Sequence, residues 1–274
     1  MMPADNPAVM HTNRAFCYGD GLFETIHANG TRLQFFPSHY KRVTGHMSLL
    51  KMKPPPGFSE KKVEEQIVRL LNKNRLLKGA RVRLAVFRNS GGYYTPATNE
   101  SSFLIAATPL ENDLYKLNRK GLCTAIYRDI MKPVNSFSNM KTSNSLLYIM
   151  AGVKKSETGM DDMIILNDKG RLCEGISSNL FIVKNGELFT PPLSDGCVAG
   201  IMRSQILRIA RKLGYSCHET SLLPEDLKNA DEFFFTNAIA GIRWVVAWEK
   251  RRFYSKTAAF LSEELNLEQF GETN

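Results

Sequence analysis

Apolar residues recur along the chain with two different periods, about two in some segments and about 3.6 in others. Residues 81–88 alternate strictly, so that Val82, Leu84 and Val86 share one face of a predicted strand and Arg83 lies on the other. Between residues 40 and 50 the apolar positions recur at helical spacing instead. The chain is therefore predicted to combine short strands with amphipathic helices in an α+β fold.

The same patterns, with their start and stop residues, place the other elements. Helices are predicted to begin at Ser38, at Ser59 with Gly79 as its stop, near residue 146, at Gly200, at Pro224 and near residue 255. Strands are predicted near 22–26 and at 32–36, 81–88, 102–108, 122–130, 163–166, 180–184, 187–190, 232–236 and 242–247. Residues 1–17 lack periodicity and predict at most a short strand.

Two turns and one polar segment indicate how these elements are grouped. Asn29-Gly30 and Asn185-Gly186 each separate two predicted strands, and both dipeptides are typical of tight hairpins. Residues 109–119 are polar and weakly patterned, which makes them the predicted interdomain linker. We therefore expect a smaller N-terminal domain at residues 1–110 and a larger C-terminal domain at residues 111–274.

Composition places the chain among ordinary globular proteins. Its 274 residues, 43% of them apolar, suffice to bury a large core. No apolar run approaches the roughly 20 residues that cross a bilayer, and the N-terminus lacks the pattern of a signal peptide. The five cysteines are dispersed without a C-x-x-C pair, so reduced thiols in the cytoplasm are expected, with no disulfide framework and no metal site.

The net charge of +9 is the one unusual bulk property. Basic residues are scattered, and their longest run, residues 250–252, has only three members and no accompanying basic–aromatic motif. A nucleic-acid-binding surface is therefore disfavoured, as is a membrane partner. The charge fits better with attraction of an anionic small molecule.

Candidate chemistry begins with a lysine and a glutamate. Lys141 lies in Asn-Met-Lys-Thr-Ser-Asn, between a loop and a predicted helix, where an amine can be desolvated and become nucleophilic. Glu174 lies in Cys-Glu-Gly-Ile-Ser-Ser-Asn, between two predicted strands. A carboxylate held among strands can pair with a buried cation, so the two residues are expected to contact one bound molecule.

A phosphate site can be assembled from three other segments. Arg42 offers a bidentate donor, and the helix that begins after Gly200 offers free N–H groups. Thr236-Asn237-Ala238 adds a hydroxyl, an amide and backbone donors. A reactive lysine, a carboxylate and a phosphate site are the groups that pyridoxal 5'-phosphate requires.

Seven motifs resemble those of the class IV aminotransferase family, the fold-type IV pyridoxal-phosphate enzymes, which include branched-chain and D-amino-acid aminotransferases and aminodeoxychorismate lyase. They occur in the family's order over nearly the whole chain. They are Tyr18-Gly19-Asp20-Gly21-x-Phe23-Glu24, His39-x-x-Arg42, Lys141-x-x-Asn144, Glu174-Gly175-x-x-Ser178-Asn179-Leu180-Phe181, Thr190-Pro191, Gly200-Ile201-Met202-Arg203 and Thr236-Asn237-Ala238.

The resemblance implies a role for each residue. Lys141 would carry the cofactor through a Schiff base and move the substrate proton, and Glu174 would hydrogen-bond the protonated pyridine nitrogen. The other implied cofactor contacts are Arg42, Ser177, Ser178, Val198, Ile201, Met202, Thr236, Asn237 and Ala238, and the implied substrate contacts are Arg83, Phe23 and Tyr93. The implied fold is D-amino-acid aminotransferase-like, with a smaller N-terminal α/β domain and a larger, barrel-like C-terminal domain.

Several of these residues also have an ordinary structural interpretation. Arg83 on a strand can simply form a salt bridge, and Tyr93 and Tyr94 can pack within their loop. His39 and His46 are interpreted as helix-surface residues and not as catalysts. The resemblance further implies a homodimer acting on a small amino substrate, with an N-terminus that lacks part of the family's first strand.

The reaction is left between two members of the family. Arg88-x-Ser90-Gly91-Gly92, Lys141-x-x-Asn144 and Thr236-Asn237-Ala238 resemble aminodeoxychorismate lyase of folate biosynthesis, which releases pyruvate and 4-aminobenzoate. Tyr93 stands where that lyase often has an arginine, and Phe23-Glu24 with Arg83 also suits a branched-chain or D-amino-acid transaminase of amino-acid metabolism. The lyase is favoured narrowly, with the transaminase as the alternative. A non-catalytic protein with a degenerate pyridoxal-phosphate site is opposed by the intact Lys141 and Glu174.

Overall fold

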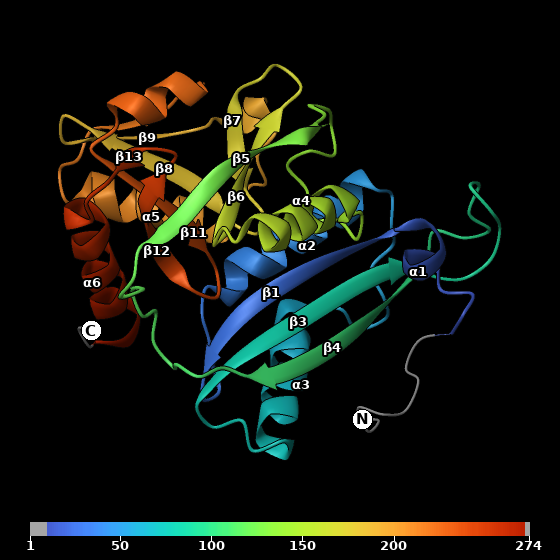
Figure 1. Ribbon diagram of the computed structural model, residues 1–274. Coiled ribbons are helices and arrows are strands. Elements are labelled where there is room, and N and C mark those ends of the chain that lie inside the picture. The colour runs from blue at the N-terminus through green and yellow to red at the C-terminus, as the bar shows by residue number, and fades with distance from the viewer. Residues whose placement is uncertain (1–9, 272–274) are drawn as a thin grey trace. The chain divides into compact units, whose positions relative to one another are not determined.

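The computed structural model describes residues 10–271, and the chain divides into two compact units. Unit 1 comprises Met1–Asp113 and Met140–Asn144, and unit 2 comprises Leu114–Asn139 and Ser145–Asn274. Each unit contains both helices and strands, as the apolar pattern predicts (Figure 1).

Unit 1 is built on a four-stranded antiparallel sheet with strand order β2-β1-β3-β4. Its strands are β1 (Gly21–Asn29), β2 (Arg32–Leu33), β3 (Gly79–Arg88) and β4 (Ser101–Pro109), and its helices are α1 (Arg14–Tyr18), α2 (Phe36–Leu49) and α3 (Glu60–Lys73). Figure 1 shows α2 and α3 on one face of this sheet. Val82, Leu84 and Val86 of β3 pack there in the buried core, so the predicted alternation is confirmed.

Helix boundaries in unit 1 follow the caps only in part. Ser59 accepts a hydrogen bond from the Lys62 amide at 3.4 Å, so the predicted start of α3 is confirmed. The predicted stop at Gly79 is wrong, because the left-handed backbone of Arg75 (φ 54°) already turns the chain and Gly79 opens β3. Helix α1 replaces the short strand expected before residue 18, and residues 1–9 of that prediction lie outside the described residues.

The segment that carries Lys141 is hydrogen-bonded to β1. The Phe23 amide donates to the Lys141 carbonyl at 3.0 Å, and the Ser143 amide donates to the Gly21 carbonyl at 2.9 Å. Residues 140–144 therefore extend this sheet and belong to unit 1. The predicted domain boundary, which assigned Lys141 to the C-terminal domain, stays a prediction, and the compact units differ from it at this segment.

Unit 2 is built on a nine-stranded mixed sheet with order β10-β9-β8-β11-β12-β5-β6-β7, on which β13 pairs with β12. Its strands are β5 (Leu122–Lys132), β6 (Asp162–Asn167), β7 (Leu172–Gly175), β8 (Asn179–Lys184), β9 (Glu187–Thr190), β10 (Cys217–Glu219), β11 (Glu232–Asn237), β12 (Gly241–Trp248) and β13 (Arg251–Arg252). Its helices are α4 (Leu146–Thr158), η1 (Leu193–Asp195), α5 (Ile201–Lys212), η2 (Pro224–Asn229) and α6 (Lys256–Phe270).

Helices cover this sheet where the strands are most apolar. Helix α4 packs on β5 and β6, and α5 and α6 pack on β11. Asn185 and Gly186 join β8 to β9 with φ of 53° and 78°, so the predicted hairpin is confirmed. Among residues 10–271, none of the helices combines the length and apolar character needed to cross a membrane.

Candidate active site

Lys141 and Arg83 contact the same aromatic ring in unit 1. Lys141 Nζ lies 4.4 Å from the centre of the Phe23 ring, and Arg83 Cζ lies 3.9 Å from that centre. Phe23 is on β1, and Arg83 is on β3 opposite Thr25. All three are half-buried, and they project from the sheet face opposite Val82 and Leu84. The predicted reactive amine and the predicted carboxylate-binding cation therefore both lie against one aromatic ring.

Arg42, the predicted phosphate ligand, is bound to a buried glutamate. Its Nε donates to Glu24 Oε1 at 2.8 Å and its Nη2 donates to Glu24 Oε2 at 2.5 Å. His39 Nδ1 lies 2.6 Å from the same Oε2. Glu24 is on β1, whereas Arg42 and His39 are one turn apart on α2. Only about 1% of Glu24 and of His39 is exposed, whereas the Arg42 side chain is 10% exposed.

The prediction that His39 lies on the helix surface is wrong. Helix α2 buries Phe36, His39, Val43 and Met47 on one face. The four-residue spacing from His39 to Val43 and Met47 carries this signal in the sequence, because residues four apart share a helix face. Its imidazole therefore belongs to the core of unit 1 and completes the Glu24 cluster.

The charges within this cluster follow from burial and pairing. Burial pushes the pKa of Glu24 up, but Arg42 and the hydrogen bond from His39 outweigh it and hold this pKa at about 2. Burial also lowers the pKa of His39 below its usual 6.5, against the opposing effect of Glu24. An ionised carboxylate only accepts hydrogen bonds, so His39 is the Nδ1–H tautomer and donates to Glu24.

Glu174 is the centre of a second buried cluster, in unit 2. Its Oε1 accepts hydrogen bonds from Lys132 Nζ at 2.5 Å and from the Tyr148 hydroxyl at 2.7 Å, and its Oε2 accepts one from the Val198 amide at 2.8 Å. Glu174 is 3% exposed and Lys132 6%. Burial and the charge of Glu174 raise the pKa of Tyr148 far above its usual value, so its hydroxyl remains a donor.

Lys132 and Tyr148 are site residues that the sequence reasoning missed. Lys132 ends β5 and also donates to the Ser138 carbonyl at 2.9 Å, and Tyr148 lies in the first turn of α4. A lysine at the end of a strand and a tyrosine in a helix carry no signal that sets them apart from surface residues. Their roles follow only from the packing that brings three segments to one carboxylate.

Asn179 connects the Glu174 cluster to the predicted phosphate site. Its Nδ2 donates to the Val198 carbonyl at 2.8 Å, and it is paired with Thr236 across strands β8 and β11. A Cβ added to Gly200 would lie 1.8 Å from Asn179 Oδ1, so only glycine fits at the start of α5. Val198, Gly200 and Thr236 are thereby held around one asparagine side chain.

Several polar groups in this part of unit 2 have no partner within the described part of the chain. There, no side chain caps the first turn of α5, which begins with Ile201 and Met202. Among residues 10–271, the buried hydroxyl oxygens of Thr236 and Ser178 have no hydrogen-bond partner. Unpaired buried hydroxyls and an uncapped helix start are groups that a phosphate oxygen would satisfy. This donor set fits the phosphate of pyridoxal phosphate.

The remaining predicted site residues have structural roles or are exposed. Asn237 Oδ1 accepts hydrogen bonds from the amides of Ile239 and Ala240 at 3.0 and 2.8 Å, which shapes the turn after Ala238. The side chain of Ser177 is exposed, and that of Tyr93 is 81% exposed. The Tyr93 carbonyl, with those of its two preceding glycines, accepts a hydrogen bond from Arg14.

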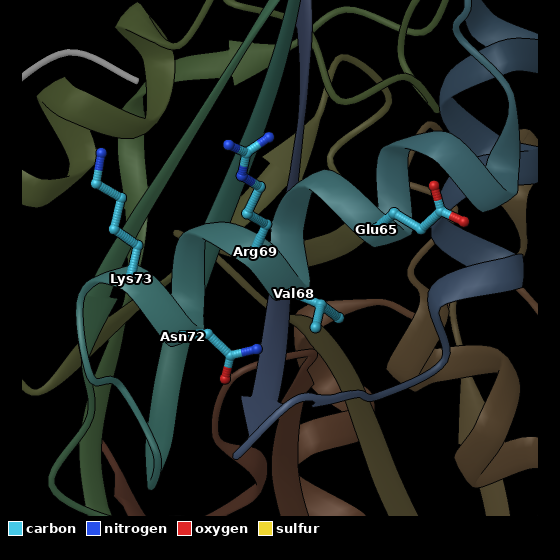
Figure 2. Close-up of a pocket in the computed structure, with 5 residues that line it drawn as sticks. All are labelled: Glu65, Val68, Arg69, Asn72 and Lys73. Atoms are coloured by element: carbon cyan, nitrogen blue, oxygen red, sulfur yellow. The ribbon is translucent and has the colours of Figure 1, made fainter.

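A surface hollow on α3 lies apart from every predicted site residue. It is lined by Glu65, Val68, Arg69, Asn72 and Lys73, which all project from that one helix (Figure 2). Within the described residues, no group of three His, Cys, Asp or Glu side chains could hold a metal ion.

Known proteins resemble this chain in sequence and in fold. Residues 21–248 match the family model of the class IV aminotransferases. The aminodeoxychorismate lyase of Vibrio harveyi is 25% identical over 232 residues, which cover 84% of this chain and 83% of that protein. The D-alanine aminotransferase of Bacillus licheniformis is 26% identical over 249 residues, which cover 88% and 83%.

A solved structure gives the fold comparison. The branched-chain amino acid aminotransferase of Escherichia coli superposes with a TM-score of 0.88 at 25% identity, covering 100% of this chain and 93% of the other. The fold class predicted from the sequence, the two-domain α+β fold of the fold-type IV enzymes, is therefore confirmed.

Proposed function

Because the chain belongs to the class IV aminotransferase family, whose members are pyridoxal-phosphate-dependent enzymes, we propose that it cleaves 4-amino-4-deoxychorismate to 4-aminobenzoate and pyruvate. The observation that carries chemistry at an amine-bearing carbon, in the lyase and the transaminase alike, is the contact of Lys141 Nζ and the Arg83 guanidinium with one Phe23 ring. This contact places a reactive amine and a guanidinium against the same ring. A guanidinium is suited to bind a carboxylate, and the proposed substrate has carboxylates.

The residues of the family motifs would hold the cofactor. Lys141 would attach it covalently, Arg42 would bind its phosphate, and Glu174 would accept a hydrogen bond from its ring nitrogen. The supporting contacts proposed are those of Ser177, Ser178, Val198, Ile201, Met202, Thr236, Asn237 and Ala238. When bound, pyridoxal phosphate supplies a carbonyl that condenses with amines and a ring that accepts electron density from bonds at the amine-bearing carbon.

Three hydrogen-bond donors hold the Glu174 carboxylate in one place. Lys132 and Tyr148 donate to Oε1, and the Val198 amide donates to Oε2. A carboxylate offers about four lone-pair sites, so three donors leave capacity for one more. Glu174 would use it for the protonated ring nitrogen.

Lys141 would be the general base, and Arg83, Phe23 and Tyr93 would bind the substrate. In the proposed reaction the carbon that bears the amino group loses a proton, the C–O bond to the enolpyruvyl group breaks, and the ring becomes aromatic. The proton passes to Lys141, and the leaving group becomes pyruvate on protonation. No second substrate is consumed, which separates this reaction from transamination.

The lyase motifs of the chain support this choice. Sequence identity does not separate the candidates, because the Vibrio harveyi lyase is 25% identical and the Bacillus licheniformis aminotransferase 26% identical. An amino-acid transaminase is the second candidate, because an arginine beside the reactive amine also suits a carboxylate on the amine-bearing carbon. The family resemblance further supports a homodimer in the cytoplasm, which sedimentation and fractionation would test.

A product assay separates the two candidates. The cofactor-loaded protein is expected to form 4-aminobenzoate from 4-amino-4-deoxychorismate, and Lys141→Ala is expected to retain less than about one thousandth of that rate. Keto-acid-dependent transamination of D- or L-amino acids, without 4-aminobenzoate formation, would replace the lyase by the transaminase.

A further inference from the structure

Glu24 is a carboxylate placed on the apolar face of a strand. Its neighbours on that face of β1, Leu22 and Ile26, belong to the buried core of unit 1. Removing a carboxylate from water costs several kcal/mol, and a buried ion pair can often be replaced by apolar residues without loss of stability. Stability alone therefore gives little reason for a charge at this position.

The contacts of Glu24 constrain Arg42. The two donors on Arg42 belong to its Nε and Nη2 atoms, so the planar guanidinium is held along one edge. A free arginine side chain has many rotamers, and ordering it costs conformational entropy. Because this clamp already fixes the side chain, a ligand of Arg42 need not supply that ordering.

His39 constrains Glu24 in turn. Its Nδ1–H donates to Oε2, the oxygen that Arg42 Nη2 also contacts. Among residues 10–271 its other ring nitrogen, Nε2, is buried without a hydrogen-bond partner. An unsatisfied buried nitrogen lowers the stability of the fold. Strand β1 and helix α2 therefore carry a chain of contacts from His39 through Glu24 to Arg42.

We propose that Glu24 and His39 are positioning residues that orient Arg42 toward the phosphate of pyridoxal phosphate. The proposal rests on the proposed function, in which Arg42 binds that phosphate. The proposal predicts the direction in which phosphate affinity changes when Glu24 is removed. Glu24 is negative, so by charge alone its removal would strengthen phosphate binding; by positioning, its removal weakens phosphate binding.

The test compares two ligands that differ only in the phosphate. Dissociation constants of pyridoxal phosphate and of pyridoxal are measured with cofactor-depleted protein for the wild type, Glu24→Gln, Arg42→Gln and the double variant. Glu100→Gln serves as the matched control, because Glu100 forms an exposed ion pair with Lys53 in the same unit. His39→Leu is a second variant that leaves Glu24 and Arg42 in place.

Arg42→Gln and Glu24→Gln are each expected to weaken pyridoxal phosphate binding about 10–100-fold. Pyridoxal binding is expected to change less than about threefold, and the double variant to match Arg42→Gln. His39→Leu is expected to act in the same direction with a smaller loss. If Glu24→Gln does not fold, the His39→Leu variant provides the test. The proposal is overturned if His39→Leu binds pyridoxal phosphate over pyridoxal with the same preference as the wild type.

The outcomes distinguish a failure of the positioning role from a failure of the proposed phosphate site at Arg42. If Arg42→Gln lowers phosphate-dependent affinity and Glu24→Gln leaves it unchanged or raises it, the positioning role is overturned and the cofactor site stands. If Glu24→Gln weakens both ligands equally, its role is structural only, which also overturns the proposal. If Arg42→Gln changes neither constant, the proposed phosphate site fails, and the inference fails with it.

Discussion

Glu24 in unit 1 and Glu174 in unit 2 are two buried carboxylates with similar partners and different origins. Each pairs with a cation, Arg42 or Lys132, and each accepts a hydrogen bond from an aromatic side chain, His39 or Tyr148. The partners of Glu24 come from one turn of α2. Those of Glu174 come from the end of β5, from α4 and from the backbone at Val198.

This difference teaches how each carboxylate is held in place. The Glu24 cluster forms wherever β1 and α2 pack, because its members lie only 15 and 18 residues apart. The Glu174 cluster forms only when three separate segments of unit 2 have assembled. In the proposed site, the first cluster would direct a protein cation, and the second would present a carboxylate to a bound molecule. Perturbing one is therefore expected to leave the other intact.

Removal of a buried cation is expected to have the largest effect on stability. Arg42→Met and Lys132→Met each leave a buried carboxylate without its countercharge, and each is expected to lower the free energy of unfolding by about 3–5 kcal/mol. Lys53→Met, which breaks the exposed pair with Glu100, is expected to cost less than about 1 kcal/mol. Urea unfolding measures all three. A loss at Lys132 as small as that at Lys53 would contradict the account of the Glu174 cluster.

Acid should weaken the first cluster over a defined pH range. The folded-state pKa of Glu24 is lowered from 4.5 to about 2, so its stabilisation is complete above about pH 4.5 and is lost as the pH falls toward 2. The expected loss is about 3 kcal/mol in the free energy of unfolding. Glu24→Gln should show a correspondingly shallower decline over this range. Equal slopes for the two proteins would argue against a paired, ionised Glu24.

Loss of the Tyr148 hydroxyl is expected to have the smallest effect. Tyr148→Phe removes a hydrogen bond to a carboxylate and should lower the free energy of unfolding by about 1.5–3 kcal/mol. Tyr40→Phe is the matched control, because the Tyr40 hydroxyl donates to the neutral Phe58 carbonyl at 2.8 Å and should cost about 0.5–1.5 kcal/mol. Chemical denaturation of both variants tests the ranking. Equal costs would mean that the negative charge of Glu174 does not strengthen its hydrogen bond with Tyr148.

Sequence reasoning assigned a cofactor contact to one member of each cluster, Arg42 or Glu174, and none to the residues that hold it. Glu174 and Arg42 lie in motifs, so they could be named without a structure. Lys132 and Tyr148 could not, because a lysine ending β5 meets Glu174 only through the packing of the nine-stranded sheet. The helix-spaced positions of α2 did contain the signal for His39, but histidine was interpreted as a surface residue. Periodicity placed most strands, and caps failed where a left-handed residue such as Arg75 ended a helix early.

The central claim is that Lys141 is the amine that binds the cofactor, and its most direct test is to find which lysine is modified. The protein is supplied with pyridoxal phosphate, reduced with borohydride and mapped by peptide mass spectrometry. The account predicts a pyridoxyl group on Lys141 and none on Lys132, the buried lysine paired with Glu174. A group on Lys132, or no modified lysine at all, would contradict it.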